Sequence, residues 1–444
     1  MSGHATASSR TAPSTAAPAA TPAGGIAGLS IRLVVMMLLE FMVFGSWFAT
    51  FGLVLATHGL PTIIGTAYTL AAVAAIISPM FLGALGDRFF ASQKVLGVAH
   101  LLGAGVMVLL PRVVTAGKGN LVLWLIFGYM LLFMPTLGLA NQIAFRQLGS
   151  RGRLFPYIRV SGTLGWAIAG LAVGWLGLSA SANLFVVTAI SSLALGLYSF
   201  TLPSTPPPAK GVRFSLGDVV GARAMRLFRH RNFVVFFVCV LLTAISLGVY
   251  NSFASAFLGA VGIKNVAGVL ALGQLSEVAF ILTIPWVVRN FGIKWALSGG
   301  MVMWGVRFVL FAMAAGGHSW LAVLAICLQG ICNDFFLVVG AMYIDQVAPL
   351  EIAAQAQNLL IMAISGVGAV IGAYFSGLVY GSVVAPRQAA LGATAWTPMW
   401  WLPIGAAVLT AVLWLGFFRY DRKVPVARLT LDAPVAVPAA MAAS

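Results

Sequence analysis

The sequence predicts an all-α integral membrane protein with twelve transmembrane helices arranged as two six-helix bundles. Of its 444 residues, 61% are hydrophobic and 8% are charged, whereas about a quarter of the residues in soluble domains are charged. A membrane-spanning helix needs about 20 mostly apolar residues, and the chain divides into twelve such runs. A basic, proline-containing segment separates the first six runs from the last six, which indicates two bundles.

The twelve expected spans define the domain organisation. The N-terminal bundle is expected over 31–202, a basic cytoplasmic linker over 203–231 and the C-terminal bundle over 232–418. Residues 1–30 and 419–444 are expected to be cytoplasmic tails; the first is rich in Ala, Ser, Thr, Pro and Gly, which predicts disorder, and does not resemble a cleavable signal peptide. The expected spans are 31–56, 61–85, 94–111, 119–144, 155–179, 182–202, 232–259, 265–288, 293–315, 318–344, 355–381 and 397–418.

The formal charge of +16 follows the loops between the expected helices. Alternate loops hold most of the basic residues, and the other loops hold only Arg112, Lys118, Lys264 and Arg387. Because cytoplasmic loops carry the excess of Lys and Arg, both termini are expected in the cytoplasm, with the protein in a bacterial inner membrane. This distribution argues for a lipid bilayer as partner and against nucleic acid.

A short motif joins the second and third expected helices. It reads Gly83-Ala-Leu-Gly86-Asp87-Arg88, with Lys94 six residues further on. It resembles the loop motif of the major facilitator superfamily, which implies that Gly83, Asp87 and Arg88 belong to a cytoplasmic latch that opens and closes as access alternates. The alternative is a short polar loop that follows the charge rule.

Five ionisable residues fall inside apolar runs: Glu40, Glu277, Asp334, Arg159 and Arg307. An ionisable group at bilayer depth costs a few kcal/mol, so each is a functional hypothesis that requires a partner. Glu277, Asp334 and Glu40 are the candidates for proton coupling. Arg307 is equally compatible with a structural partnership to a buried acid.

One face of the fifth expected helix combines a cation, a hydroxyl and a large aromatic ring. Arg159, Thr163 and Trp166 are spaced i, i+4 and i+7, so they project from the same face. Arg159 lies just after Pro156, near the cytoplasmic end of its helix, and is also compatible with snorkelling to the interface. Trp166 is compatible with ordinary helix packing as well as with stacking on a flat ligand.

Amides and acids on other helices lie at comparable depth. Gln274 and Glu277 are three residues apart and share a helix face, and Asn251 and Asn333-Asp334 add further polar groups. An amide and a carboxylate together can hydrogen-bond a polyhydroxylated or heterocyclic ligand. The alternative for the amides is interhelical hydrogen bonding, a common use of such side chains in membranes.

Several long segments, in one order along the membrane region, carry a more specific resemblance. They are Phe44-Gly-Ser-Trp47, Met134-Pro-Thr-Leu-Gly-Leu139, Ile158-Arg-Val-Ser-Gly-Thr-Leu-Gly-Trp166, Gln274-Leu-Ser-Glu277, Phe280-Ile-Leu-Thr-Ile-Pro285, Asp334-Phe-Phe336 and Ala354-Gln-Ala-Gln357. With these segments the chain resembles the bacterial nucleoside:proton symporter family, a branch of the major facilitator superfamily. The resemblance implies a nucleoside and a proton as ligands, and a substrate site between the halves that is formed by Arg159, Thr163, Trp166, Asn251, Gln274, Glu277 and Asp334.

Three positions depart from the family pattern. Gly248 stands where a Gln is expected three residues before the Asn of the seventh helix, Trp166 stands in place of Phe, and Asn333 stands in place of an aromatic residue. An altered aromatic pair and a lost amide can change the base preference or the substrate class. A carrier for a sugar or a nucleobase is therefore the alternative function.

An enzyme and a channel are the alternatives from other classes. HExxH and GxSxG motifs are absent, and of the five histidines only His100 falls in the interior of an expected helix, so a membrane enzyme is disfavoured. The two-bundle organisation disfavours a channel. Cys239, Cys327 and Cys332 lie inside expected helices without CxxC spacing, so no cofactor, metal or disulfide is expected. The protein is expected to function as a monomer.

Overall fold

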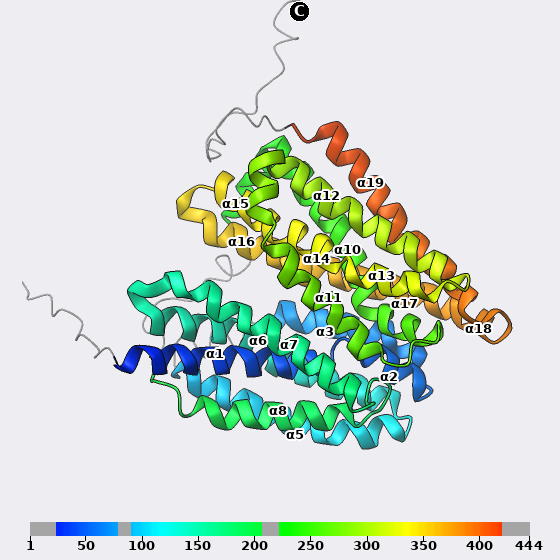
Figure 1. Ribbon diagram of the computed structural model, residues 1–444, viewed down its shortest axis with the longest axis horizontal. Coiled ribbons are helices and arrows are strands. Elements are labelled where there is room, and N and C mark those ends of the chain that lie inside the picture. The colour runs from blue at the N-terminus through cyan, green and yellow to red at the C-terminus, as the bar shows by residue number, and fades with distance from the viewer. Residues whose placement is uncertain (1–23, 79–89, 207–221, 420–444) are drawn as a thin grey trace, which may run out of the picture.

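The computed structural model describes residues 24–78, 90–206 and 222–419, and within these ranges the chain is helical, without strands. Figure 1 shows the helices of the first half of the chain gathered on one side of the molecule and those of the second half on the other. The latch residues Gly83, Asp87 and Arg88, most of the linker and residues 1–23 and 420–444 of the expected tails lie outside the described residues. Residues 24–30, expected to belong to a disordered tail, are the first turns of helix α1, so the prediction was wrong for them.

The first half consists of long helices joined by short turns. Gly59 and Gly117 lie in the turns that precede α3 and α6, and both have positive φ. A residue without Cβ adopts this conformation without strain. The helices are α1 (Gly24–Gly45), α2 (Phe51–Thr57), α3 (Ile64–Ser78), α5 (Ser92–Thr115), α6 (Gly119–Leu148), α7 (Phe155–Trp175) and α8 (Leu184–Ser199).

The second half contains more breaks. At Leu328 the chain bends by 47° between two helical pieces, and a π-helical turn follows at Asp334–Val338. Its helices are α10 (Arg231–Ala260), α11 (Val266–Ile281), α12 (Ile284–Ala315), α13 (Ser319–Cys327), α14 (Gln329–Asn333), α15 (Val339–Val347), α16 (Ala353–Ile361), α17 (Ala369–Val379), α18 (Ala385–Leu391) and α19 (Trp401–Phe417). Two further π-helical segments, η7 (Met362–Gly368) and η8 (Tyr380–Val384), flank α17.

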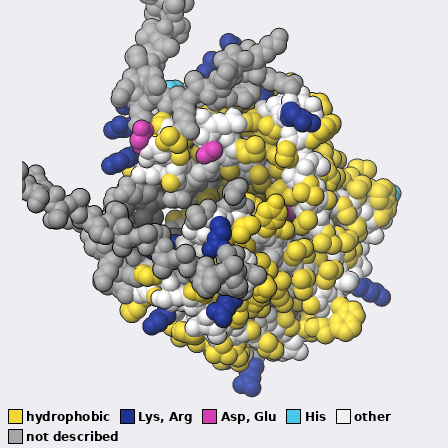
Figure 2. All heavy atoms as spheres, turned by 60° about the vertical axis from the view of Figure 1, so that its left-hand side comes forward, with side chains coloured by type: hydrophobic (Ala, Val, Ile, Leu, Met, Phe, Trp, Pro, Cys, Tyr) yellow, Lys and Arg dark blue, Asp and Glu magenta, His cyan; other side chains and the backbone are white. Residues whose placement is uncertain are grey.

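The chain is a multi-pass membrane protein. Seven helices in the described ranges are long and apolar enough to cross a membrane, or eight if the bent α13–α15 pair is one span. All twelve expected spans fall on helical segments where the chain is described, which is consistent with the expected number. Large apolar side chains such as Trp124 and Trp175 are mostly exposed, and hydrophobic side chains dominate the right-hand flank in Figure 2, as a lipid-facing surface requires.

The break between the eighth and ninth expected spans lies earlier in the chain than predicted. The eighth ends at Ile281, and a new helix begins at Ile284 with Pro285 in its first turn, where a missing N–H leaves no bond unmade. The direction then changes at Gly292, whose φ of 82° interrupts α12. The sequence marked the proline but not the early break.

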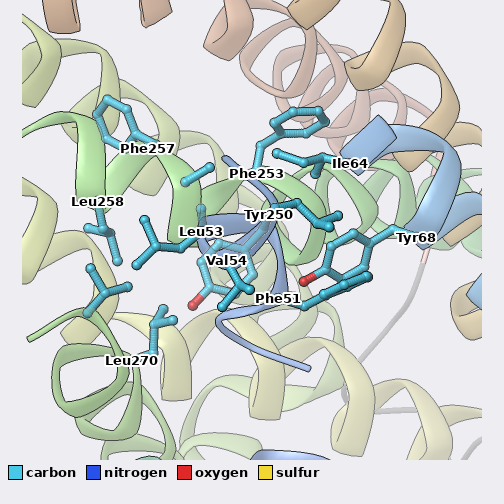
Figure 3. Close-up of a cluster of buried hydrophobic side chains, with 14 of the residues drawn as sticks. Phe51, Leu53, Val54, Ile64, Tyr68, Tyr250, Phe253, Phe257, Leu258 and Leu270 are labelled. Carbon is cyan, nitrogen blue, oxygen red and sulfur yellow. The ribbon is translucent and has the colours of Figure 1, made fainter. Parts of the chain in front are cut away.

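The two halves touch at one end of the molecule. In the first turn of α3, a Cβ on Gly65 would lie 2.5 Å from the Gly377 Cα of α17, so two glycines permit the crossing. Leu53 of α2 donates its N–H to Ser255 Oγ of α10 at 3.2 Å, and Ala267 of α11 donates its N–H to Ser179 Oγ at 3.2 Å. Side chains from both halves fill this end with apolar packing (Figure 3).

Candidate functional site

A cavity of about 360 Å³ lies between the two halves. Cavities of about 300–1,000 Å³ are typical of small-molecule sites. Helices α1, α3, α6 and α7 supply one wall, and α10, α11, α14, η7 and α17 supply the other. The apolar packing of Figure 3 includes Tyr68 and Tyr250, which also line the cavity, so this packing closes one end of it.

The wall from α7 carries the cation and the aromatic ring that helical spacing predicted. Arg159, Thr163 and Trp166 all line the cavity. The Arg159 guanidinium lies 4.2 Å from the centre of the Phe41 ring of α1, an attractive cation–π geometry. Trp166 meets Phe44 edge to face, with ring centres 4.7 Å apart. The Arg159 side chain therefore points into the cavity.

Close packing of α1 and α7 holds this wall in place. A Cβ on Gly45 would lie 2.8 Å from Trp166 Cα, and a Cβ on Gly162 would lie 2.6 Å from the Phe41 ring. Small residues at such a crossing let two membrane helices approach closely. Since the backbone near Trp166 is fixed against α1, the ring is presented in a defined position.

The opposite wall is organised around one carboxyl oxygen of Glu277. Its Oε1 accepts hydrogen bonds from Asn333 Nδ2 at 2.6 Å, from Gln329 Nε2 at 2.9 Å and from Gln274 Nε2 at 3.4 Å. Among the described residues no hydrogen bond reaches Oε2. That oxygen is therefore left for a ligand or a proton.

Gln329 also connects Glu277 to a buried arginine. Its Oε1 accepts from Tyr250 Oη at 2.7 Å and from Arg307 Nη2 at 2.9 Å. Arg307 is fully buried, and its guanidinium lies 3.7 Å from the centre of the Tyr250 ring. Arg307 thus reaches the acid through an amide, which supports the structural alternative for this residue.

Six of the seven expected substrate residues line the cavity: Arg159, Thr163, Trp166, Asn251, Gln274 and Glu277. Asp334 is not among the lining residues. It follows Asn333 directly but lies at the start of the π-helical turn, buried, with no hydrogen bond to Oδ2 among the described residues. Neighbouring residues on a helix point about 100° apart, so Asn333 lines the cavity and Asp334 does not.

Glu40 lies elsewhere. This side chain is fully buried among α1, α5, α6 and α8, where it pairs with His100 at 3.0 Å, and it is not among the lining residues. The structure therefore separates the three proton-coupling candidates, because only Glu277 faces the cavity directly.

Gln329 and Tyr250 are lining residues that sequence analysis missed. Gln329 precedes Asn333 by four residues, so helical spacing contained a signal for it. Tyr250 adjoins Asn251 and carried no separate signal. Gly248, where an amide was expected, lies against α17: a Cβ there would be 2.9 Å from the Ala369 carbonyl oxygen. Amides from α14 thus line the cavity, whereas α10 contributes close packing at that position.

Comparison with known proteins shows the family of the chain. Residues 27–423 match the family described as Nucleoside H+ symporter. The chain belongs to this family. It is 36% identical over 401 residues to YegT of Escherichia coli (strain K12), covering 87% of this chain and 93% of that protein. It is 30% identical over 413 residues to the xanthosine permease of the same organism, covering 88% and 96%.

Solved structures of transporters share the fold. The crystal structure of the nucleoside transporter NupG aligns with a TM-score of 0.75 and 28% identity, over 88% of this chain and all of that one. A peptide transporter of the POT family aligns with a TM-score of 0.67 at 14% identity, over 91% of this chain and 99% of that one, and shows the fold alone. The predicted all-α major facilitator fold is thereby confirmed.

Proposed function

We propose that this protein imports nucleosides together with protons by alternating access across a bacterial inner membrane. The observation that carries the proposal is the cavity between the halves, with Arg159 and Trp166 on one wall and the amide-bound Glu277 on the other. Membership of the nucleoside H+ symporter family supports the same function.

The cavity offers a suitable partner for each part of a nucleoside. The Trp166 ring supplies a flat face on which a base can stack. Asn333 Oδ1 is buried without a hydrogen-bond partner among the described residues, so it can accept from an N–H of the base. Arg159, Asn251 and Thr163 supply donors and acceptors for the sugar hydroxyls and base carbonyls.

Glu277 is the proposed carrier of the transported proton. Its Oε2 is the oxygen that the amides leave free, so a proton can bind there without displacing Gln329 or Asn333. A proton on Glu277 removes the negative charge that faces Arg159 across the cavity. Coupling requires that the substrate and the proton bind with different affinities in the two conformations, and this change of charge can supply the difference. The electrical part of the proton gradient adds about 2.3 kcal/mol per charge per 100 mV. Asp334 is a second candidate.

In the proposed alternating-access mechanism, the contacts that close one end of the cavity must open during transport. The contacts of α2, α3, α7, α10 and α11 that join the halves lie at the end predicted to be periplasmic, so the described conformation opens toward the cytoplasm. Transport requires these contacts to separate while the latch of Gly83, Asp87 and Arg88 closes the other end. Both termini are then cytoplasmic, and one chain contains the whole site.

The test is uptake of radiolabelled uridine and adenosine by cells that lack their own nucleoside carriers. The protein should accumulate at least one of them, a protonophore should abolish accumulation, and Glu277→Gln should lower it at least tenfold. Asp334→Asn is measured in parallel, and Glu351→Gln, at an exposed acid outside the cavity, is the control. Absence of uptake above background refutes the nucleoside assignment, and competition by free sugars or bases instead of nucleosides would establish the alternative carrier.

A further inference from the structure

The N-terminal helices contain a buried acid–base pair that the proposed transport site does not use. Glu40 of α1 is 0% exposed and His100 of α5 is 2% exposed. Glu40 Oε2 lies 3.0 Å from His100 Nε2. Thr136 Oγ1 of α6 lies 2.7 Å from Glu40 Oε1 and 2.5 Å from the Phe133 carbonyl oxygen, and it gives its one hydrogen to one of these two acceptors. Both oxygens of the acid are therefore in hydrogen-bonding contact.

Ser192 of α8 fixes the other side of the imidazole. Its Oγ donates to the His100 carbonyl oxygen at 3.0 Å and lies 3.0 Å from His100 Nδ1. A hydroxyl has one hydrogen to donate. When that hydrogen is given to the carbonyl, Nδ1 carries a hydrogen and donates it to Oγ; when it is given to Nδ1, the imidazole carries its hydrogen at Nε2.

The first arrangement, with the Ser192 hydrogen on the carbonyl and the Thr136 hydrogen on Glu40, defines the loaded state of the pair. With Nδ1 protonated, a neutral imidazole has only a lone pair at Nε2, so Glu40 must be the carboxylic acid that donates to it. The other possibility is an imidazolium that donates to a carboxylate. Both arrangements hold one proton between Nε2 and Oε2 and have zero net charge, which burial requires.

We propose that Glu40 and His100 form a second proton-binding site, whose loading and release are coupled to the cavity through α1. Release to water would leave a carboxylate and a neutral imidazole. To keep their hydrogen bond, the remaining hydrogen must move to Nε2, and Ser192 must turn its hydroxyl from the His100 carbonyl to Nδ1. Proton release therefore breaks a bond between α5 and α8 and leaves a buried negative charge.

Two contact chains connect this pair with the cavity. Phe41 follows Glu40 directly on α1 and lies beneath the Arg159 guanidinium. The Phe133 ring of α6 lies 6.0 Å from the imidazole and 5.0 Å from the Phe44 ring, which contacts Trp166. A rearrangement of the pair can thus reach Arg159 and Trp166, two of the three α7 residues that line the cavity.

Few other ionisable side chains lie beside Glu40 and His100. Tyr129 of α6 interacts electrostatically with Glu40. From α5 and α8 the groups that face it are the imidazole itself and the Ser192 hydroxyl, and from α6 the Thr136 hydroxyl. Among the described contacts of Glu40, no further charged side chain offsets a lost proton.

The test compares exchange with driven transport in proteoliposomes, and it rests on the proposed proton-coupled function. Glu40→Gln keeps a hydrogen-bond donor toward Nε2 but cannot release it as a proton. The rate of nucleoside counterflow, which needs no net proton movement, should stay within about twofold of the wild-type rate. The accumulation driven by a pH gradient should fall at least tenfold. Glu351→Gln is the control. Accumulation by Glu40→Gln equal to wild type would overturn the proposal.

A substrate-independent measurement separates this inference from the proposed function. In ¹⁵N-histidine NMR of the wild-type protein, the His100 signals are those missing from His100→Gln, and they should show a protonated Nδ1 near neutral pH. An unprotonated Nδ1 would overturn the proton site even if Glu40→Gln did not fold. Absence of any nucleoside counterflow by wild type would refute the nucleoside function and leave the NMR result to decide the proton site.

Discussion

Gly65 of α3 and Gly377 of α17 face one another where the halves meet, and a Cβ on Gly65 would lie 2.5 Å from the Gly377 Cα and 2.9 Å from the Ala373 carbonyl oxygen. Both atoms belong to backbone, so neither can rotate away as a side chain can. This crossing is therefore possible only for two residues without side chains, and it forms part of the closed end of the cavity.

Gly65→Val is expected to prevent this closure. The added atoms must push α3 from α17, which disfavours the described conformation and lowers nucleoside uptake at least tenfold at matched protein levels. Gly105→Val is the matched control, because Gly105 is exposed on α5 and an added Cβ would meet nothing within 4 Å. Uptake by Gly65→Val at the wild-type rate would show that the crossing is not needed for transport.

Trp166→Ala should weaken nucleoside binding. Stacking of a base on an aromatic side chain contributes about 1–3 kcal/mol, so the dissociation constant should rise by about 5- to 150-fold. Trp124→Ala is the control, since Trp124 is 70% exposed on the expected lipid surface of α6. Calorimetric titration of the purified protein with nucleosides measures both, and equal affinities of the two variants would mean that Trp166 is a packing residue.

The sequence predicted the class of fold and singled out six residues that line the cavity, because both depend on local patterns. Apolar runs mark the helices, and the i, i+4, i+7 spacing of Arg159, Thr163 and Trp166 survives in the structure because α7 is a regular helix. Asp334 follows Asn333 directly but is not a lining residue, because successive residues of a helix point about 100° apart. The π-helical turn that begins at Asp334 has no signal in hydropathy.

Partnerships across helices were beyond the sequence. Glu40 and His100 are 60 residues apart, and Gln329 joins Arg307 to Glu277 across three helices. Such contacts depend on how helices pack, whereas sequence spacing reports only which residues share a face. Gly248 illustrates this limit. In the sequence it is noticed only as the loss of an expected amide, whereas in the structure it allows α10 to pack closely against α17.

The membrane orientation can be measured at the two ends of α10. Arg226 and Lys264 are both exposed and flank this 30-residue helix, which is about 45 Å long at 1.5 Å per residue. In a background without Cys239, Cys327 and Cys332, an impermeant maleimide should label Lys264→Cys in intact cells. It should label Arg226→Cys only after permeabilisation, because Arg226 belongs to the basic cytoplasmic linker. The reverse pattern would contradict the assignment of cytoplasmic termini.

Gln329→Leu should destabilise the protein and weaken substrate binding together. Leu has a similar size but cannot accept from Arg307 and Tyr250 or donate to Glu277. A buried polar group left without its partner costs about 1–3 kcal/mol, so the unfolding temperature in detergent should fall. The nucleoside dissociation constant should rise about tenfold, because Glu277 loses one of the amides that orient it.

A second substitution separates these two effects. Replacing both partners of a buried hydrogen bond by apolar groups is often nearly neutral, so Arg307→Met combined with Gln329→Leu should recover part of the lost stability. It should not recover nucleoside affinity, because Glu277 still lacks the Gln329 donor. Gln346→Leu, at an exposed position of α15, is the control and should change neither quantity. If the double variant were less stable than Gln329→Leu alone, Arg307 would have to be held by partners other than Gln329, and the link from Arg307 to Glu277 would lose its support.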